Sequence, residues 1–150
     1  MKVVLQTVNE GSVTIDGKLI SKIGRGFLLL VGFTDGDSKE IVDMMVDKIL
    51  KLRVFSDENG QTNLGLDDVH GQILSVSQFT LYADTKKGRR PSFVNALNPH
   101  DALDLYEYFN AKIEERYDTP ATGIFGADMK VASINDGPFT VILDSKELWG

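Results

Sequence analysis

Several residue types that often carry chemistry are rare or missing in this chain. It contains no cysteine and only two histidines, His70 and His100. The missing cysteine excludes a disulfide framework, a thiol nucleophile and a zinc–thiolate site. The histidines lie far apart in the sequence and neither has a partner at metal-ligand spacing, so we expect no metal site.

Long apolar runs are also missing. The longest, Phe27–Val31, is far shorter than the roughly 18 residues that suggest a membrane span. No basic segment followed by an apolar signal core stands at the N-terminus, so we expect a cytoplasmic protein without a membrane partner. The formal net charge of −6 argues against broad, non-specific binding of nucleic acid, although it permits a local basic patch.

The hydrophobic pattern predicts strands at both ends of the chain. Residues 2–33 alternate as strands do, with Asp16-Gly17 as a hairpin turn and 26–33 as a central strand that is apolar on both faces. Two further strands, about 127–134 and 139–144, are expected to close the chain.

Two helices are expected between these strands. The first begins with Asp37 as its cap and Glu40 three residues later, a variant of the capping box. The second begins with Asn98 as its cap and Pro99 at the first helical position. Their apolar faces comprise Ile41, Met45, Ile49 and Leu52 in the first and Ala102, Leu105, Phe109, Ile113 and Tyr117 in the second. The order of elements predicts one α/β domain, residues 1–150, with a mixed sheet or two stacked sheets.

The strand that begins at Leu74 carries polar residues where its pattern predicts core. Leu74 and Val76 point to one face, and the next side chains on that face are Gln78 and Thr80. A hydroxyl in this strand, from Ser77 or Thr80, could be a nucleophile activated by a neighbour such as Lys86. Most strand serines and threonines only hydrogen-bond to neighbours, so both interpretations stay open.

A basic cluster follows this strand directly. Lys86, Lys87, Arg89 and Arg90 supply a quarter of the 16 basic residues within five positions. The cluster is either a solvated loop with a glycine turn or a patch that binds phosphates and positions a nucleic-acid backbone.

The segment "NDGP" at 135–138 forms a second unusual motif. A turn between two strands is its simplest interpretation. If the Gly137-Pro138 bond were cis, its carbonyl groups would be rigid acceptors that could recognise an ammonium group. The sequence leaves the isomer open.

The segments "SQFTL" at 77–81 and "NDGP" at 135–138 together resemble the signature motifs of the D-aminoacyl-tRNA deacylases, which include the D-tyrosyl-tRNA deacylases. Four further segments resemble the family in register: "QTVNEGSVTIDG", "LRVFSDENGQTNL", "YADTKKGRRPSF" and "TGIFGADMKV". The similarity covers essentially the whole chain. It implies layered mixed β-sheets with two main helices packed on one side.

The resemblance also implies a composite active site in a homodimer. The strand segment Ser77, Gln78, Phe79 and Thr80 would form the pocket floor for the 3′ end of aminoacyl-tRNA. Backbone N–H groups around Phe79 and Thr80 would hold the ester carbonyl as an oxyanion hole does. Gly137 and Pro138, joined by a cis bond, would enter from the other subunit and bind the substrate ammonium. Phe125 and Met129 would line the adenosine end, while Lys86, Lys87, Arg89 and Arg90 would bind the tRNA backbone.

The chemistry implied by this family needs no cofactor, metal or protein nucleophile, because a ribose hydroxyl of the terminal adenosine helps to activate water. An alternative makes Thr80 a nucleophile that accepts the acyl group. L-aminoacyl esters would be excluded by a rigid wall that their side chain meets. Glycine has no side chain to exclude, so glycyl-tRNA is expected to be hydrolysed as well.

This chain departs from the family pattern after Gln6, where Thr7 replaces a usual arginine that braces the Gly-Pro carbonyls. A neutral hydroxyl cannot make the same charge-assisted contacts, which puts the chiral filter in question. Two alternatives therefore stand beside the D-specific hydrolase: a deacylase of relaxed chirality, and a non-catalytic RNA-binding protein that uses the basic residues 86–90. Gln61 and Thr62 also replace a usual Lys-Met pair, a change that we interpret as peripheral.

Overall fold

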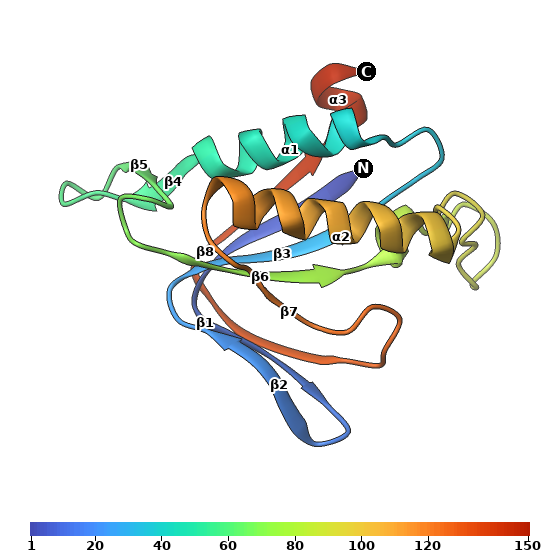
Figure 1. Cartoon of the computed structure of the whole chain (residues 1–150), viewed down its shortest axis with the longest axis horizontal. Coiled ribbons are helices and arrows are strands. Elements are labelled where there is room, and N and C mark those ends of the chain that lie inside the picture. Colours follow the sequence, from blue (N-terminus) through green and yellow to red (C-terminus); the bar gives the residue numbers. More distant parts are fainter.

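The computed structural model describes residues 1–150 and places them around one strongly curved, mixed sheet (Figure 1). Its strands are β1 (Lys2–Ile15), β2 (Lys18–Ile23), β3 (Gly26–Gly32), β6 (Gln72–Ser77), β7 (Ala121–Thr122) and β8 (Lys130–Asp144). The order is β2-β1-β3-β6-β7, and β8 pairs with β1 along almost its whole length. β6 runs parallel to β3 and β7, whereas all other pairs are antiparallel. Strands β4 (Arg53–Ser56) and β5 (Thr62–Gly65) form a separate hairpin.

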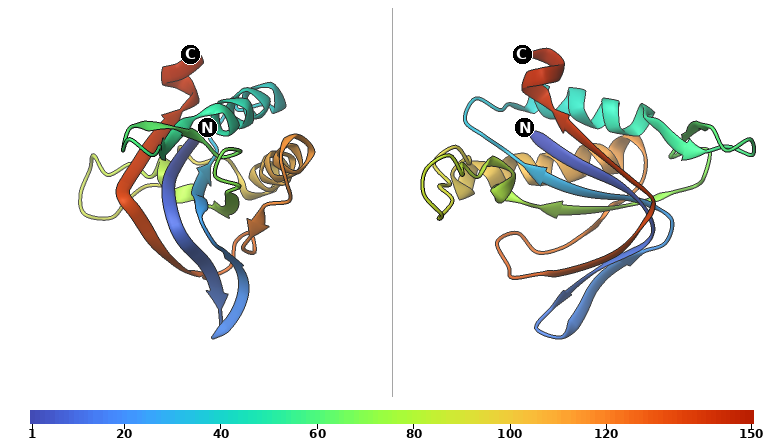
Figure 2. Two further views of the ribbon diagram at one scale, coloured as in Figure 1. Left: turned by 90° about the vertical axis from the view of Figure 1, so that its left-hand side faces the viewer. Right: turned by 180° about the vertical axis from the view of Figure 1, so that it is seen from behind.

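The two long helices, α1 (Lys39–Lys51) and α2 (Pro99–Arg116), lie side by side on one face of the sheet (Figures 1 and 2). This arrangement confirms the predicted α/β fold with two main helices on one side. A short helix, α3 (Ser145–Trp149), follows β8. None of the helices combines the length and the apolar composition that crossing a bilayer requires.

The predicted start of α2 is confirmed and that of α1 is shifted by one residue. The Asn98 side chain accepts a hydrogen bond from the N–H of Asp101, and Pro99 begins the helix. The cap of α1 is Ser38, not Asp37. The Asp37 carboxylate instead binds the N-terminal ammonium of Met1 at 2.7 Å and the N–H of Thr34 at 2.8 Å. A full positive charge is the stronger partner for this carboxylate, so the neighbouring hydroxyl caps the helix.

Two apolar clusters hold the sheet in place, one on each face. The larger lies between the sheet and the helices and includes Phe27, Leu29 and Val31 of β3. The smaller lies on the opposite face and includes Leu28 of β3 and Leu74 of β6. Strand β3 is therefore covered on both faces, as its continuous apolar sequence predicts.

The C-terminal half of the sheet differs from the prediction in one respect. The expected strands at 127–134 and 139–144 form a single strand, β8, antiparallel to β1. Asn135 pairs with Val8 and Thr140 with Gln6, so residues 136–139 bulge out of the ladder opposite a single residue, Thr7. The Asp16-Gly17 turn is confirmed, with φ of 50° and 77°, the left-handed values of a tight hairpin.

Candidate active site

A cavity of about 570 Å³ opens at the carboxyl ends of the parallel strands β3 and β6. Ligands of open α/β sheets commonly bind at this edge. Four segments line it: the end of β3 with Phe33, the end of β6 with the turn that follows it, residues 93–102 up to the first turn of α2, and residues 125–131. Of the 19 lining residues, 12 are hydrophobic, which suits a ligand with an apolar body and a few polar groups.

The segment after β6 is a turn and not a strand, which corrects the expectation for Thr80. Strand β6 ends at Ser77, and Phe79–Tyr82 form a 3₁₀ helix. The turn packs tightly on β3, because the Gln78 N–H donates to the Val31 carbonyl at 2.8 Å. A Cβ atom at Gly32 would lie 2.8 Å from the Gln78 carbonyl oxygen, so only glycine fits there.

This turn separates the four predicted residues of the segment. Ser77, Gln78 and Phe79 line the cavity, whereas Thr80 does not. The Gln78 Nε2 donates to the Thr80 Oγ1 at 2.6 Å. Neither the Ser77 nor the Thr80 hydroxyl hydrogen-bonds to Lys86, a histidine or a carboxylate. The chain thus offers no adjacent base for a hydroxyl nucleophile.

The start of the 3₁₀ helix leaves two backbone donors free. The N–H groups of Phe79 and Thr80 have no acceptor in the chain, whereas the following turn is closed by bonds from Leu81 to Gln78 and from Ala83 to Thr80. Unsatisfied donors are normal at a helix N-terminus, and here the first belongs to Phe79, which lines the cavity, and the second to the residue that follows it. Two such groups can bind a carbonyl oxygen that develops negative charge.

Phe125 and Met129 also line the cavity; their contact with an adenosine stays a prediction. The Phe125 ring lies 6.0 Å from that of Tyr106 on α2. The Met129 sulfur packs directly over Gly123, where a Cβ atom would lie 2.3 Å away from it. These contacts fix an apolar, sulfur-containing wall that is suited to a flat ring system.

Tyr106 was not found from the sequence, although it ties the cavity wall to β6. Its buried hydroxyl donates to the carbonyl of Ser75 at 2.8 Å, one residue before Val76, the first residue of β6 that lines the cavity. Burial raises the pKa of Tyr106. Tyrosine on a helix stripe gives no sequence signal beyond core packing, and only the pairing of α2 with β6 shows this contact.

The Gly137-Pro138 bond is cis, as the resemblance implies. The Thr7 hydroxyl donates to the Asp136 carbonyl at 2.8 Å and so holds the first residue of the bulge. Across the bulge, the Asn135 side chain accepts a hydrogen bond from the Phe139 N–H at 3.0 Å. Gly137 and Pro138 are exposed and do not line the cavity of their own chain.

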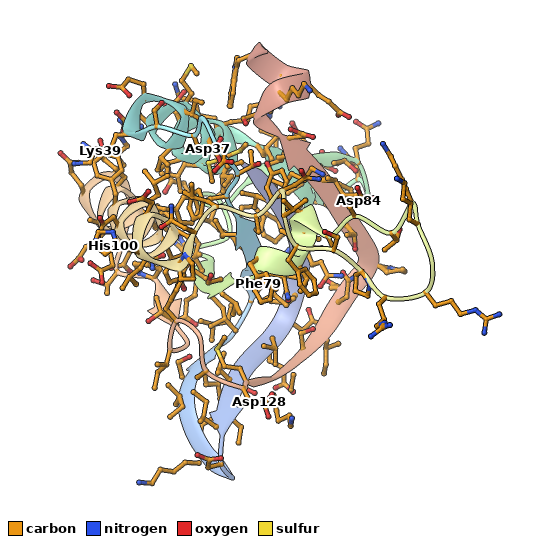
Figure 3. The ribbon with its side chains drawn as sticks, turned by 90° about the vertical axis from the view of Figure 1, so that its right-hand side faces the viewer. Asp37, Lys39, Phe79, Asp84, His100 and Asp128 are labelled. Carbon is orange, nitrogen blue, oxygen red and sulfur yellow. The ribbon has the colours of Figure 1, made fainter.

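The predicted basic cluster lies on an exposed loop that stands out from the body of the molecule (Figure 3). A pair of 2.8 Å hydrogen bonds between the backbones of Asp84 and Ser92 closes its base. The basic residues Lys86, Lys87, Arg89 and Arg90 form no ion pair within the chain. Their charges are therefore available to an anionic ligand.

The expectation that neither histidine has a partner at metal-ligand spacing is incomplete for His100. His100 lies at the start of α2 beside Asp101 and Asp104, and ligand atoms of the three come within 4.8 Å of one another. All three side chains are exposed, and His100 is labelled in Figure 3. Hydrogen bonds from Asn98 and then His100 lower the pKa of Asp101, so the group also serves the helix cap.

Comparisons with known proteins agree with this geometry. The model of the family described as D-Tyr-tRNA(Tyr) deacylase matches residues 4–144. Proteins named D-aminoacyl-tRNA deacylase from Lactobacillus acidophilus and Lactobacillus delbrueckii are 56% and 57% identical over 144 residues, or 96% of this chain and 99% of each relative.

Two solved structures share the fold. One, titled c-Myc DNA Unwinding Element Binding Protein, is 41% identical with a TM-score of 0.90, and the match covers 96% of this chain and 98% of the other. A probable eukaryotic D-amino acid tRNA deacylase shares the fold at 21% identity with a TM-score of 0.81, over 95% of this chain and 97% of the other. The matches span nearly the whole chain and include the cavity, and on this basis the protein belongs to the D-Tyr-tRNA(Tyr) deacylase family of hydrolases.

Proposed function

We propose that this protein hydrolyses the ester bond between a D-amino acid and the 3′ end of tRNA, releasing both in free form. The observation that carries this proposal is the pair of free N–H groups on Phe79, which lines the cavity, and on Thr80, the next residue. They stand beside no activated protein nucleophile. A site of this kind stabilises an oxyanion and leaves the attack to water.

The reaction follows from these groups. The ester carbonyl oxygen accepts hydrogen bonds from the two N–H groups while Phe125 and Met129 hold the terminal adenine. Water, assisted by a ribose hydroxyl of that adenosine, adds to the carbonyl carbon. The tetrahedral intermediate then collapses, the bond to the ribose oxygen breaks, and that oxygen takes a proton. A well-placed oxyanion donor is worth about 3–4 kcal/mol of barrier.

The chiral filter is proposed to come from a second copy of the chain. Gly137 and Pro138 are exposed and lie outside their own cavity, so they are available to the cavity of a partner. Their carbonyls would bind the substrate ammonium and leave no room for an L side chain. Glycyl-tRNA would pass this filter, because glycine has no side chain in either position.

The exposure of β8 supports the homodimer. Apart from Leu143, no residue of this 15-residue strand is fully buried, and Val131, Ile134 and Ile142 lie exposed along it. One edge of β8 pairs with β1, and no strand pairs with the other. A long apolar edge strand normally has a cover, which a second copy would supply.

The basic loop would contact the tRNA backbone. Its four cations form no ion pair within the chain. Asp84, at the base of the loop, lies on the face that Figure 3 presents, as do Phe79 and Asp128 of the cavity lining. Binding through them would position the acceptor end without reading bases, and it would weaken as salt rises.

Two other functions also have observations in their favour. Thr7 braces the bulge with a neutral hydroxyl, which favours a deacylase of relaxed chirality. The free basic loop favours a non-catalytic RNA-binding protein, and the 41% identical structure is titled as a DNA-binding protein.

Side-by-side deacylation of D-tyrosyl-, L-tyrosyl- and glycyl-tRNA separates the three. Loss of the D and glycyl esters with the L ester spared is the expected result. Loss of all three would establish relaxed chirality. Salt-dependent RNA binding without turnover of any ester would leave the binding protein and overturn the hydrolase.

A further inference from the structure

Two phenylalanine rings stand exposed between the cavity and the basic loop. Phe79 is 53% exposed and Phe93 is 42% exposed. Their rings meet edge to face with centroids 5.0 Å apart. The next residue, Val94, is 75% exposed. We call these three residues the aromatic shelf. Exposed apolar groups gathered beside a site commonly mark a binding surface.

The fold does not need the shelf to be apolar, because hydrogen bonds already fix this segment. The Asp84 and Ser92 backbones pair just before the shelf. Just after it, the Thr34 hydroxyl donates to the Asn95 carbonyl at 2.6 Å, and the Leu97 N–H donates to the Phe33 carbonyl at 3.0 Å. The rings are thus held on a braced backbone, as a preorganised binding surface requires.

The position of the shelf points to a single-stranded nucleic acid. Phe79 and Phe93 line the cavity, and the loop with four unpaired cations begins and ends at the Asp84–Ser92 pair beside them (Figure 3). A strand whose last nucleoside occupies the cavity and whose phosphates reach the loop must pass the shelf. Proteins bind such strands by combining a basic groove with aromatic side chains on which bases stack.

We propose that the aromatic shelf stacks the base of the nucleotide that precedes the terminal adenosine. This inference rests on the proposed function, which places that adenosine in the cavity. Stacking tolerates any base, which fits an enzyme that acts on many tRNAs. The cations favour a polyanion over a second copy of the chain as occupant, and β8 offers a separate apolar surface to that copy.

The test compares two small substrates, D-tyrosyl adenosine and D-tyrosyl cytidylyl-adenosine. The added cytidine should raise kcat/KM of the wild-type protein by about tenfold or more. Phe93→Ala should lose most of this gain, and Phe93→Trp should keep it. Met44→Ala, a change of an exposed apolar residue on α1, is the matched control and should leave the gain unchanged. The ratio between substrates is the readout, so a general loss of activity does not imitate the effect.

Three results would contradict the proposed stacking of a base on the aromatic shelf. The wild type could hydrolyse both esters equally well, Phe93→Ala could slow both by the same factor, or Phe93→Ala could convert a dimer to monomers in sedimentation. The last would assign the rings to the contact between copies. If the wild type hydrolyses neither ester, the proposed function fails instead. Calorimetric binding of adenosine and cytidylyl-adenosine to the wild type and Phe93→Ala then repeats the comparison without turnover.

Discussion

Strands β3 and β8 both pair with β1, yet their side chains meet opposite surroundings. In β3 every residue except Leu30 is buried, with apolar clusters on both faces. In β8, which is about twice as long, only Leu143 is buried. A strand buried on both faces determines the fold of its own chain. A strand that shows apolar side chains and the Gly137-Pro138 bulge to the outside is expected to act on another molecule.

Truncating one apolar residue in each strand tests whether β3 and β8 contribute differently to the stability of the chain. Phe27→Ala removes a fully buried ring that stacks on Phe55 at 5.2 Å. We expect the free energy of unfolding to fall by about 3–5 kcal/mol. Ile142→Ala, on the face of β8 that is exposed in the single chain, should change the unfolding free energy of the monomer by less than about 0.5 kcal/mol. Urea denaturation at protein concentrations low enough to populate the monomer measures both, and equal losses would show that β8 is as much a core strand as β3.

A charge on β8 tests whether another copy covers it. Ile134 is half exposed, so Ile134→Asp should leave the circular dichroism of the chain intact. An unpaired charge in a dimer contact costs about 3–5 kcal/mol, so we expect monomers in sedimentation and a loss of deacylation of roughly a hundredfold or more. Met44→Asp places the same charge on an exposed apolar residue of α1 and should change neither. An Ile134→Asp protein that stays dimeric would place the contact elsewhere.

The brace of the bulge is expected to affect selectivity more than rate. Thr7→Val keeps the shape of the buried side chain but removes the hydroxyl that donates to the Asp136 carbonyl. Without this bond the observed conformation of the bulge should be less stable by about 1–3 kcal/mol. The ratio of D- to L-ester hydrolysis should therefore fall by about tenfold. Thr14→Val, whose hydroxyl makes no hydrogen bond, is the control. An unchanged ratio would mean that the brace is not needed.

The hydrogen bond between Tyr106 and Ser75, behind the cavity, is expected to have a smaller effect on stability, and this effect should depend on pH. Tyr106→Phe removes the bond to the Ser75 carbonyl and should lower the stability at pH 7 by about 1 kcal/mol. Burial raises the pKa of Tyr106 above the usual value near 10. The unfolded chain therefore releases this proton first, and stability that is present below about pH 10 is lost as the pH rises further. Between pH 7 and 11 the free energy of unfolding should fall less steeply for Tyr106→Phe than for the wild type. Parallel curves of this free energy against pH would contradict the expectation.

The smallest effect is expected at Thr80. Thr80→Ala removes the hydroxyl that accepts from Gln78 but keeps the backbone N–H. Deacylation should fall by no more than about tenfold, in contrast to the 10²–10³ that the loss of an oxyanion donor costs. Single-turnover kinetics with D-tyrosyl-tRNA measures this. Complete inactivation with tRNA binding intact would restore Thr80 as the nucleophile.

Much of the core could be predicted from the sequence, because burial follows period and caps follow local chemistry. The apolar run of β3, the Asp16-Gly17 turn and the Asn98-Pro99 start of α2 are all found as predicted. The cap of α1 was misplaced because Asp37 is held by the N-terminus, a contact over 36 positions that no local pattern contains.

The site was predicted less completely, because its geometry depends on contacts between distant elements. The turn at Phe79–Tyr82 follows from the fit of Gly32 against Gln78, and alternation alone extended the strand through Thr80. Thr7 could be recognised as unusual, but its bond to Asp136 requires the pairing of β1 with β8. The residues of the signature motifs remain predictions for catalysis and tRNA binding.

The central claim is that each active site combines residues of two chains, and complementation tests it most directly. Phe79→Pro removes one oxyanion donor at the first helical position, where proline is accepted. Gly137→Val reshapes the bulge, because Gly137 has a φ of 133° and a Cβ there would lie 3.0 Å from the Phe139 nitrogen. Each variant alone should be inactive.

When the two variants are mixed and reassembled, half of the dimers should contain one copy of each. Such a dimer has one intact composite site, so we expect about a quarter of the wild-type deacylation of D-tyrosyl-tRNA to return. No recovery, although mass spectrometry detects the mixed dimer, would contradict the account and place the whole site within one chain.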